Sequence, residues 1–158
     1  MSDHGCGAGL TLFAADPGHP DAACLMDRLS ETLQEITGDS GRSSFDPDEV
    51  RNAGSLFVIA RDGDGNALGC GAYRPLQPRI AELKRMYAVP GSRGVGLAIL
   101  RYLERQARAD GYEGLWLETR RVNDRAVRFY ERNGYARIPN FGKYAGRPEA
   151  VCFEKRLT

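Results

Sequence analysis

A glycine-rich loop directly ahead of an apolar run is the stretch of this chain with the clearest chemical potential. The sequence VPGSRGVGLAIL runs from Val89 to Leu100 and contains Gly91, Gly94 and Gly96. At the start of a helix several backbone N–H groups lack a partner and lie at the positive end of the helix dipole, so such a loop can hold a phosphate. A tight turn that needs glycine for positive φ uses the same residues. The loop alone therefore leaves an anion site and an ordinary turn open.

Two nucleotide-binding motifs can be tested against this loop. A dinucleotide-binding fingerprint requires glycine or alanine three residues after Gly96, where Ile99 stands. A P-loop requires Gly-Lys followed by serine or threonine, and the loop lacks that sequence. A nucleotide-binding α/β domain is therefore disfavoured, although Arg93 could still add a charge-assisted contact to a phosphate.

Metal and thiol chemistry find little support in the sequence. The histidines are His4 and His19, near the N-terminus, so we expect neither a zinc site nor a Cys-His or Ser-His catalytic pair. The segment from Asp62 to Asn66 has calcium-loop spacing, but the glycine and glutamate that such a loop needs are missing, which favours a hairpin turn. The cysteines form no C-x-x-C pair and no disulfide framework is expected: Cys6, Cys24, Cys70 and Cys152.

The composition is that of one globular domain. The chain has 158 residues, of which 42% are hydrophobic and 27% charged, with a net charge of +1. This balance provides no strong field for DNA, RNA or an acidic membrane, so we expect no nucleic-acid or membrane partner. The N-terminus has neither a basic n-region nor an apolar run. We expect a single domain over residues 1–158, frayed up to about Ala8, in a reduced cytoplasmic protein.

Hydrophobic periodicity and turn residues predict the element order β α β β β α β α β β. The strand–helix–strand unit through the glycine loop requires a parallel crossover, whereas the hairpins require antiparallel pairs. The fold class is therefore α/β, with one mixed sheet flanked by helices. The predicted strands cover residues 10–16, 80–89, 114–119, 135–138 and 150–157 and a hairpin within 55–73, and the predicted helices cover 21–37, the run from the glycine loop to Gly111, and 123–133.

Three stretches together resemble the GNAT superfamily, the Gcn5-related N-acetyltransferases: ELKRMYAVPGSRGVGLAIL, GLWLET and NDRAVRFYERNGY. The acetyl-CoA motif of that family, [QR]-x-x-G-x-[GA], fits the residues from Arg93 to Ala98. A second register, from Gly91 to Gly96, also fits, but its expected arginine is missing. The resemblance covers residues 54–158 well and the N-terminal part only by element order. A second family element is matched by Asn123, Ala126, Tyr130 and the Gly134-Tyr135 pair.

The resemblance implies a GNAT fold whose fourth and fifth strands splay apart, often at a bulge, with acetyl-CoA inserted between them and no metal. Met86, Tyr87 and Ala88 would pair with the pantetheine arm through their backbone, and their N–H groups would polarise the thioester carbonyl. Asn123 and Ala126 would contact the same arm, although Asn123 also suits a helix N-cap. The pyrophosphate would lie on the backbone N–H groups of the glycine loop: Ser92, Arg93, Gly94, Val95, Gly96, Leu97 and Ala98.

The resemblance further implies direct transfer, in which a neutral amine attacks the thioester and coenzyme A leaves as a thiolate. Tyr130 would protonate the departing sulfur, whereas the helix pattern by itself favours a packed tyrosine. For the general base, Glu82 is the first candidate, on a strand face shared with Lys84 and Met86. Glu118 and deprotonation by solvent remain alternatives, since either carboxylate could equally form a surface salt bridge.

The acceptor pocket is expected to form from the first helix, the loop after Gly38 and the segment PNFGKYAGRPEA. In that segment Lys143 and Arg147 could recognise a carboxylate, or the segment could be a solvated loop packed by Phe141 and Tyr144. The expected function is acetyl transfer from acetyl-CoA to a primary amine of a small molecule or peptide. A catalytically silent CoA-binding or sensing module on the same fold is the alternative, and family analogy suggests a homodimer.

Overall fold

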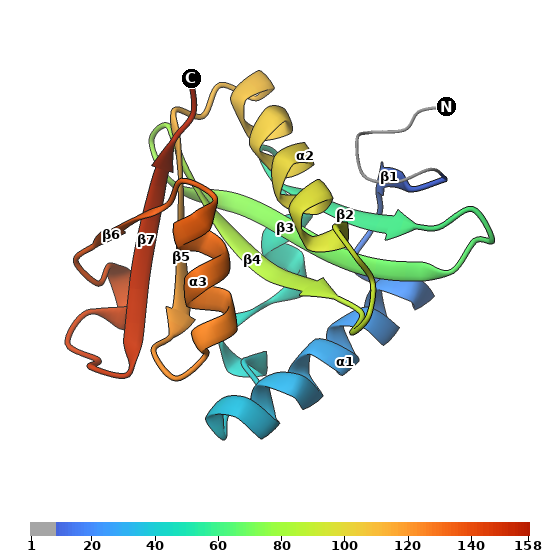
Figure 1. The fold of residues 1–158 in the computed structure, drawn as a ribbon. Coiled ribbons are helices and arrows are strands. Elements are labelled where there is room, and N and C mark those ends of the chain that lie inside the picture. Colours follow the sequence, from blue (N-terminus) through green and yellow to red (C-terminus); the bar gives the residue numbers. More distant parts are fainter. Residues whose placement is uncertain (1–8) are drawn as a thin grey trace.

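One twisted sheet with three helices forms the body of the molecule in the computed structural model, which describes residues 9–158 (Figure 1). The predicted fraying up to Ala8 lies outside the described residues. Within residues 9–158, no helix combines the length and the apolar composition needed to cross a membrane. The strands are β1 Thr11–Ala14, β2 Leu56–Arg61, β3 Ala67–Gln77, β4 Ile80–Ala88, β5 Gly114–Arg120, β6 Ala136–Ile138 and β7 Ala150–Arg156, and the helices are α1 Pro20–Thr37, α2 Val95–Ala109 and α3 Asp124–Arg132.

The strands lie in the order β1-β2-β3-β4-β5-β7-β6. Over the described part of the chain, neighbouring strands are antiparallel except β4 and β5, which are parallel. This parallel pair is connected through α2, as a crossover requires. The observed order of elements and the mixed sheet confirm the predicted α/β fold class.

Helices cover both faces of the sheet (Figure 1). On one face α2 and α3 pack through residues such as Ile99 and Val127. On the other face α1 packs through Leu25 against Phe57 of β2. Because side chains alternate along a strand, the central strands contribute to both of these cores.

Turn and capping residues end the elements where the sequence predicts. Gly38 closes α1 with φ 80°, and Gly134 follows α3 with φ 95°. The Asn123 side chain caps α3 by accepting the Ala126 N–H at 3.3 Å. In the turn between β2 and β3 the Asp62 carboxylate accepts two backbone N–H groups, which confirms a hairpin turn.

β4 and β5 lie side by side only at their starts. Residues 80–82 of β4 pair with residues 114–116 of β5. Beyond that point the two strands diverge (Figure 1), so the edge of β4 that faces β5 loses its strand partner. The predicted splay between these two strands is confirmed.

A bulge in β4 lies next to this divergence. Two residues, Arg85 and Met86, stand opposite the single residue Gly71 of β3. Arg85 has φ 55°, a left-handed conformation that costs a non-glycine residue about 1–2 kcal/mol. Its guanidinium donates hydrogen bonds to the Met26 carbonyl at 3.0 Å and to Ser30 Oγ at 2.6 Å, both on α1. These bonds hold the bulge against α1.

The bulge changes which side chains share a face of β4. Met86 packs with Leu83 in the core beneath α2, whereas Tyr87 packs in the core beneath α1. The prediction that Met86 shares a face with Glu82 and Lys84 is therefore wrong. One inserted residue reverses the alternation of a strand from that point on.

Candidate active site

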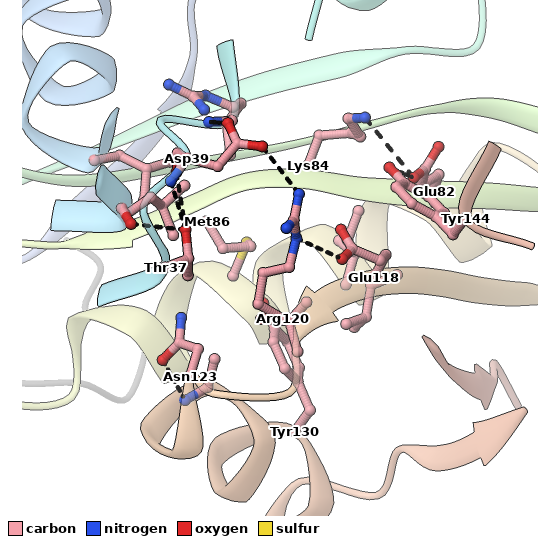
Figure 2. Close-up of a pocket in the computed structure, with 18 residues that line it drawn as sticks. Thr37, Asp39, Glu82, Lys84, Met86, Glu118, Arg120, Asn123, Tyr130 and Tyr144 are labelled. Atoms are coloured by element: carbon pink, nitrogen blue, oxygen red, sulfur yellow. Dashed lines mark hydrogen bonds and ion pairs between the residues drawn. The ribbon is translucent and has the colours of Figure 1, made fainter. Parts of the chain in front are cut away.

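A cavity of about 180 Å³ opens where β4 and β5 diverge (Figure 2). Its walls are the C-terminal half of α1 with the loop that follows, the facing strands β4 and β5, the start of α3, and Tyr144. Three of the segments expected around an acceptor pocket thus meet here, although Lys143 and Arg147 do not line the cavity. The polar and aromatic side chains of the lining are Thr37, Asp39, Glu82, Lys84, Arg85, Glu118, Thr119, Arg120, Asn123, Tyr130 and Tyr144.

The glycine-rich loop forms the turn from β4 into α2. Gly91 and Gly94 have φ of 86° and 73°, so the turn itself needs glycine at both positions. Gly94 is the N-cap, and the first helical hydrogen bond runs from the Ala98 N–H to the Gly94 carbonyl at 3.0 Å. The backbone N–H groups of residues 95–97 precede that bond and have no acceptor within the helix. The loop is therefore a turn that also presents helix donors.

The structure reduces the number of backbone N–H groups in the loop that are available to a phosphate. The Ser92 N–H is donated to the Val89 carbonyl, and the Ala98 N–H is used inside α2, so the prediction is wrong for these two amides. The Arg93 side chain is exposed and makes no hydrogen bond or ion pair with the described residues. An exposed arginine is equally available to a ligand phosphate, so both registers of the motif stay open. The donors that remain in the first turn are Val95, Gly96 and Leu97.

Gly96 leaves space that the protein does not fill. A Cβ at this position would meet Phe129 at 3.8 Å and Ala88 at 3.9 Å, which are ordinary van der Waals contacts. The φ of Gly96 is not left-handed, so neither its conformation nor crowding by residues 9–158 requires glycine there. A phosphate that approaches the N–H groups closely does require it. The residues present therefore fit a pyrophosphate at this helix start.

Backbone groups of β4 face the gap between the strands. Val89 donates its N–H to the Leu68 carbonyl at 2.8 Å, and Tyr87 also faces β3 in the same ladder. Since backbone groups alternate along a strand, the Met86 carbonyl and both Ala88 groups point to the gap. Met86 and Ala88 can therefore pair with an extended ligand lying in the gap. The backbone contact predicted for Tyr87 is wrong, because its N–H and C=O serve the β3 ladder.

Tyr130 forms part of the cavity wall. Its ring packs edge-on against Phe129 and Tyr135 at centroid distances of 5.2 and 5.5 Å, and only 7% of the residue is exposed. Burial raises the pKa of its hydroxyl well above the ordinary value, so the hydroxyl keeps its proton at neutral pH. Packing and proton donation are therefore compatible at this position. Asn123 and Ala126 line the same wall, with the Asn123 side chain serving as the cap of α3.

Glu82 reaches the cavity, but its carboxylate is fully engaged. The residue is 1% exposed. Arg74 Nη2 donates to one carboxylate oxygen at 2.7 Å, and the Tyr144 hydroxyl donates to the other at 3.2 Å. The Lys84 Nζ lies 3.8 Å from that second oxygen. These contacts suit a residue that positions Tyr144 and Lys84, and the role of Glu82 as a base stays a prediction.

Glu118 lines the same cavity from β5 with one oxygen unpaired. Its Oε2 is buried and accepts no hydrogen bond from the residues that the structure describes. Arg120 Nε lies 3.6 Å away, too far for a hydrogen bond. Removal from water raises the pKa of this carboxyl, although Arg120 and Lys84 oppose the shift. A buried acceptor without a donor is costly, so this site is suited to a donor from outside the chain.

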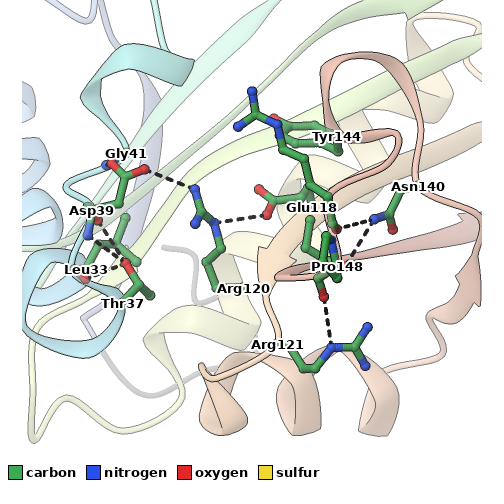
Figure 3. Close-up of polar contacts among 12 residues, drawn as sticks. Leu33, Thr37, Asp39, Gly41, Glu118, Arg120, Arg121, Asn140, Tyr144 and Pro148 are labelled. Carbon is green, nitrogen blue, oxygen red and sulfur yellow. Dashed lines mark hydrogen bonds and ion pairs between the residues drawn. The ribbon is translucent and has the colours of Figure 1, made fainter.

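Arg120 bridges the mouth of the cavity between β5 and the loop after α1 (Figure 3). Its Nη2 lies 3.0 Å from Asp39 Oδ2, and its Nε faces Glu118. The Gly41 N–H, bonded to the other Asp39 oxygen at 2.9 Å, and Arg120 lower the pKa of Asp39, so this carboxylate stays ionised. Sequence reasoning missed Arg120 and Asp39 as site residues. The available signal was the period-two spacing that places Glu118 and Arg120 on one face of a strand.

Metal and disulfide chemistry find no support in the described chain. Within residues 9–158, no three or more histidine, cysteine, aspartate or glutamate side chains are grouped to hold a metal ion. Cys24, Cys70 and Cys152 are free thiols. Cys6 and His4 lie outside the described residues.

The geometry of the site agrees with comparisons to known proteins. The model of the acetyltransferase (GNAT) family matches residues 23–135. An IAA acetyltransferase of Azospirillum brasilense is 28% identical over 151 residues, covering 94% of this chain and 98% of that protein. An N-acetyltransferase of Schizosaccharomyces pombe, C1271.07c, is 34% identical over 117 residues, covering 68% and 71%.

Solved structures share the fold of this chain. A Klebsiella pneumoniae protein assigned as an acyl-CoA N-acyltransferase superposes with a TM-score of 0.80 at 28% identity, covering 96% of this chain and all of that one. An acetyltransferase of Streptococcus agalactiae shares the fold with a TM-score of 0.77 at 20% identity, covering 96% of this chain and 100% of that one. An acyl-CoA donor follows from the family, and its pyrophosphate fits the start of α2. The chain belongs to the GNAT family and is an acetyltransferase.

Proposed function

We propose that the protein transfers the acetyl group of acetyl-CoA to a primary amine of a small molecule or peptide by direct attack. The observation that carries this proposal is the course of the unpaired β4 edge. This edge begins directly after Glu82, in the cavity, and ends at Ala88, which lies next to Gly96 at the start of α2. A donor anchored at the glycine loop and extended along this edge brings its acyl end to the cavity. The acetyltransferase name of the Azospirillum relative supports acetyl as the group transferred.

The donor-binding part of the mechanism uses backbone groups. Acetyl-CoA, when bound, supplies a thioester carbonyl as electrophile and a thiolate as leaving group. The N–H groups of residues 95–97 hold the pyrophosphate, since they lack helical acceptors and lie at the positive end of α2. Met86 and Ala88 hold the extended arm through their gap-facing backbone groups. Asn123 and Ala126 flank the pantetheine arm on the side of α3.

The proton-transfer part uses two side chains of the cavity wall. We place the proton acceptor at Glu118 instead of Glu82, because Glu118 Oε2 lacks a donor while both oxygens of Glu82 are engaged. A raised carboxyl pKa makes Glu118 a stronger base than an exposed glutamate. Tyr130, which keeps its proton, donates to the departing sulfur.

The proposal is tested by thiol release from acetyl-CoA over a panel of primary amines, with acetyl-CoA affinity measured separately by calorimetry. We expect steady turnover with at least one class of amine. Binding of acetyl-CoA without turnover of any amine would instead indicate the silent CoA-binding module. Failure to bind acetyl-CoA would contradict the donor site itself.

A glycine variant tests the cradle separately from the chemistry. Gly96→Val should raise the KM for acetyl-CoA about 10-fold or more, equivalent to ~1.4 kcal/mol of lost binding, because its side chain occupies the space left for the phosphate. The matched control is Gly63→Val in the β2–β3 turn, where a Cβ meets, among residues 9–158, only Gly9 Cα at 3.9 Å. The control should leave KM unchanged. Equal KM values for the two variants would contradict a pyrophosphate site at Gly96.

A further inference from the structure

The cavity offers a ligand two unsatisfied groups of opposite kind, side by side. Glu118 Oε2 is a buried acceptor without a donor. Arg120 lies two residues further along β5, on the same face of the strand. Its Nη2 is bonded to Asp39, whereas its Nη1 has no partner among residues 9–158. The two side chains approach to 3.6 Å, from Nε to Oε2. A ligand that satisfies both must present a donor and an acceptor close together.

We propose that the acceptor is an α-amino acid, whose amine lies at Glu118 and whose carboxylate lies at the outer edge of the Arg120 guanidinium. This inference rests on the proposed function, since it names the amine that the acetyl group reaches. In an α-amino acid one carbon separates the amine from the carboxylate, which matches two protein groups that almost touch. Arginine presents parallel N–H groups in a plane, and these suit a carboxylate.

Asp39 sets the orientation of this arginine. Its carboxylate is held by the Gly41 N–H at 2.9 Å and faces Arg120 Nη2 at 3.0 Å, so the guanidinium is fixed at the mouth before a ligand arrives. A guanidinium fixed in this way loses little side-chain entropy on binding. Figure 3 shows Arg120 held between Asp39 and Glu118, with the two carboxylates on opposite sides of it.

The charges of the lining argue against a diamine. The acidic groups Asp39 and Glu82 already have cationic partners, Arg120 and Arg74. A second ammonium close to the amine at Glu118 would therefore meet Arg120, a like charge. A simple alkylamine would satisfy Glu118 but leave the guanidinium without an anion. Of these three classes of amine, only the free amino acid provides a partner both for the Glu118 carboxylate and for the Arg120 guanidinium.

The test compares matched amines that differ only at the carboxylate. Leucine, leucinamide and 3-methylbutylamine share a side chain, and alanine, alaninamide and ethylamine repeat the series with a smaller one. We expect kcat/KM for the amino acid to exceed that for its amide and its alkylamine by about 10- to 100-fold, the effect of one charge-assisted contact. The amide has the less basic amine and therefore more of the reactive neutral form. A preference for the amino acid over its amide thus cannot come from a larger fraction of neutral amine, and this comparison is the decisive one because the alkylamine is the more basic amine.

Variants at Arg120 locate the preference. Arg120→Gln should reduce the amino acid to amide ratio to within about 3-fold of unity and leave the KM for acetyl-CoA unchanged, whereas Arg120→Lys should keep part of it because the charge remains. The matched control is Arg121→Gln, since the Arg121 guanidinium bonds the Pro148 carbonyl and does not line the cavity. The control should keep the full ratio.

The outcomes separate this inference from the proposed function. Turnover of all the amines without preference, or a preference that survives in Arg120→Gln, overturns the amino-acid assignment and leaves the acetyltransfer to primary amines intact. Thiol release from none of the amines, with acetyl-CoA still bound, overturns both.

Discussion

Two carboxylates that are largely withdrawn from solvent have opposite surroundings in this protein. Glu104 of α2 accepts hydrogen bonds from the Tyr135 hydroxyl at 2.8 Å, from Arg101 Nη1 at 2.8 Å and from Lys155 Nζ at 3.2 and 3.3 Å. Glu118 of β5 has one oxygen with no donor among the residues that the structure describes. The first carboxylate ties α2 to β7 and to the turn after α3. In the proposed function, the second receives its donor from a ligand.

The contrast shows how a buried charge can serve either the fold or the chemistry. A carboxylate whose lone pairs are all satisfied has the cost of its burial offset by its partners, and removing a partner destabilises the fold. An unsatisfied one costs stability, and a fold keeps that cost at a site where a ligand supplies the missing contact. Both carboxylates are nearly inaccessible to solvent, so burial alone does not distinguish them.

The largest expected effect is the loss of activity in Glu118→Gln. Without a carboxylate to accept the proton of the amine, kcat should fall about 100- to 1000-fold, while the melting temperature stays level or rises because an unsatisfied charge has been removed. Steady-state kinetics and a thermal melt measure both quantities on one preparation. The conservative variant Glu118→Asp should recover part of the rate. An unchanged kcat in Glu118→Gln would return the role of base to Glu82 or to solvent.

The second effect is a loss of stability in Glu104→Gln. Arg101 and Lys155 would lose the carboxylate that pairs with them but are partly exposed, so the free energy of unfolding should fall by about 2 kcal/mol. Urea denaturation measures this change. The kcat of the folded variant should match that of the wild type. A Glu104 variant with normal stability but low activity would contradict the structural role assigned to Glu104.

Two neighbouring tyrosines provide a smaller test of the same contrast. Tyr130→Phe should lower kcat about 10-fold, because the thiolate loses its proton donor, and it should change neither the KM for acetyl-CoA nor the unfolding free energy noticeably. Tyr135→Phe should leave kcat unchanged and cost about 1–2 kcal/mol of stability, because its hydroxyl is bonded to Glu104. If Tyr130→Phe behaved like Tyr135→Phe, Tyr130 would be a packing residue.

The smallest effect concerns the pH dependence of stability. The pKa of Glu118 is raised in the native state by burial, and Glu82 adds to the shift while Arg120, Lys84 and Lys143 oppose it. The native state therefore binds this proton more tightly than the unfolded state, so Glu118 lowers stability at pH values above its native pKa and the penalty disappears as the pH falls below it. Glu118→Gln should be more stable than wild type at pH 7, with the difference shrinking toward acid pH. Denaturation at several pH values measures this difference, and a difference that grows toward acid pH would contradict the assigned shift.

Local signals in the sequence were sufficient to predict the helices and strands and part of the acetyl-CoA site. Helix ends at Gly38 and Gly134, the Asn123 cap and the turn at Asp62 follow from the conformational needs of single residues, and the structure has them where they were predicted. The N–H donors after Gly94 follow in the same way, since any helix start presents them. Ser92 and Ala98 were included wrongly because their amides bond within the protein, a detail that residue types do not reveal.

Contacts between distant segments decided the rest. The bulge at Arg85 depends on hydrogen bonds to α1, residues 55 and 59 positions away, and it alone moves Met86 to the opposite face of β4. The engagement of Glu82 depends on Tyr144, 62 residues later. None of these partners is marked by a local pattern.

The sequence by itself determined the family, the order of elements and the glycine-rich start of α2, because each depends on residues close together in the chain. Only the tertiary structure distinguished Glu118 from Glu82 and brought Arg120 to Asp39, 81 residues apart, at the mouth of the cavity. The physical reason is that hydrogen-bond satisfaction belongs to a set of neighbours in space. A carboxylate in the sequence carries no record of which donors will reach it after folding.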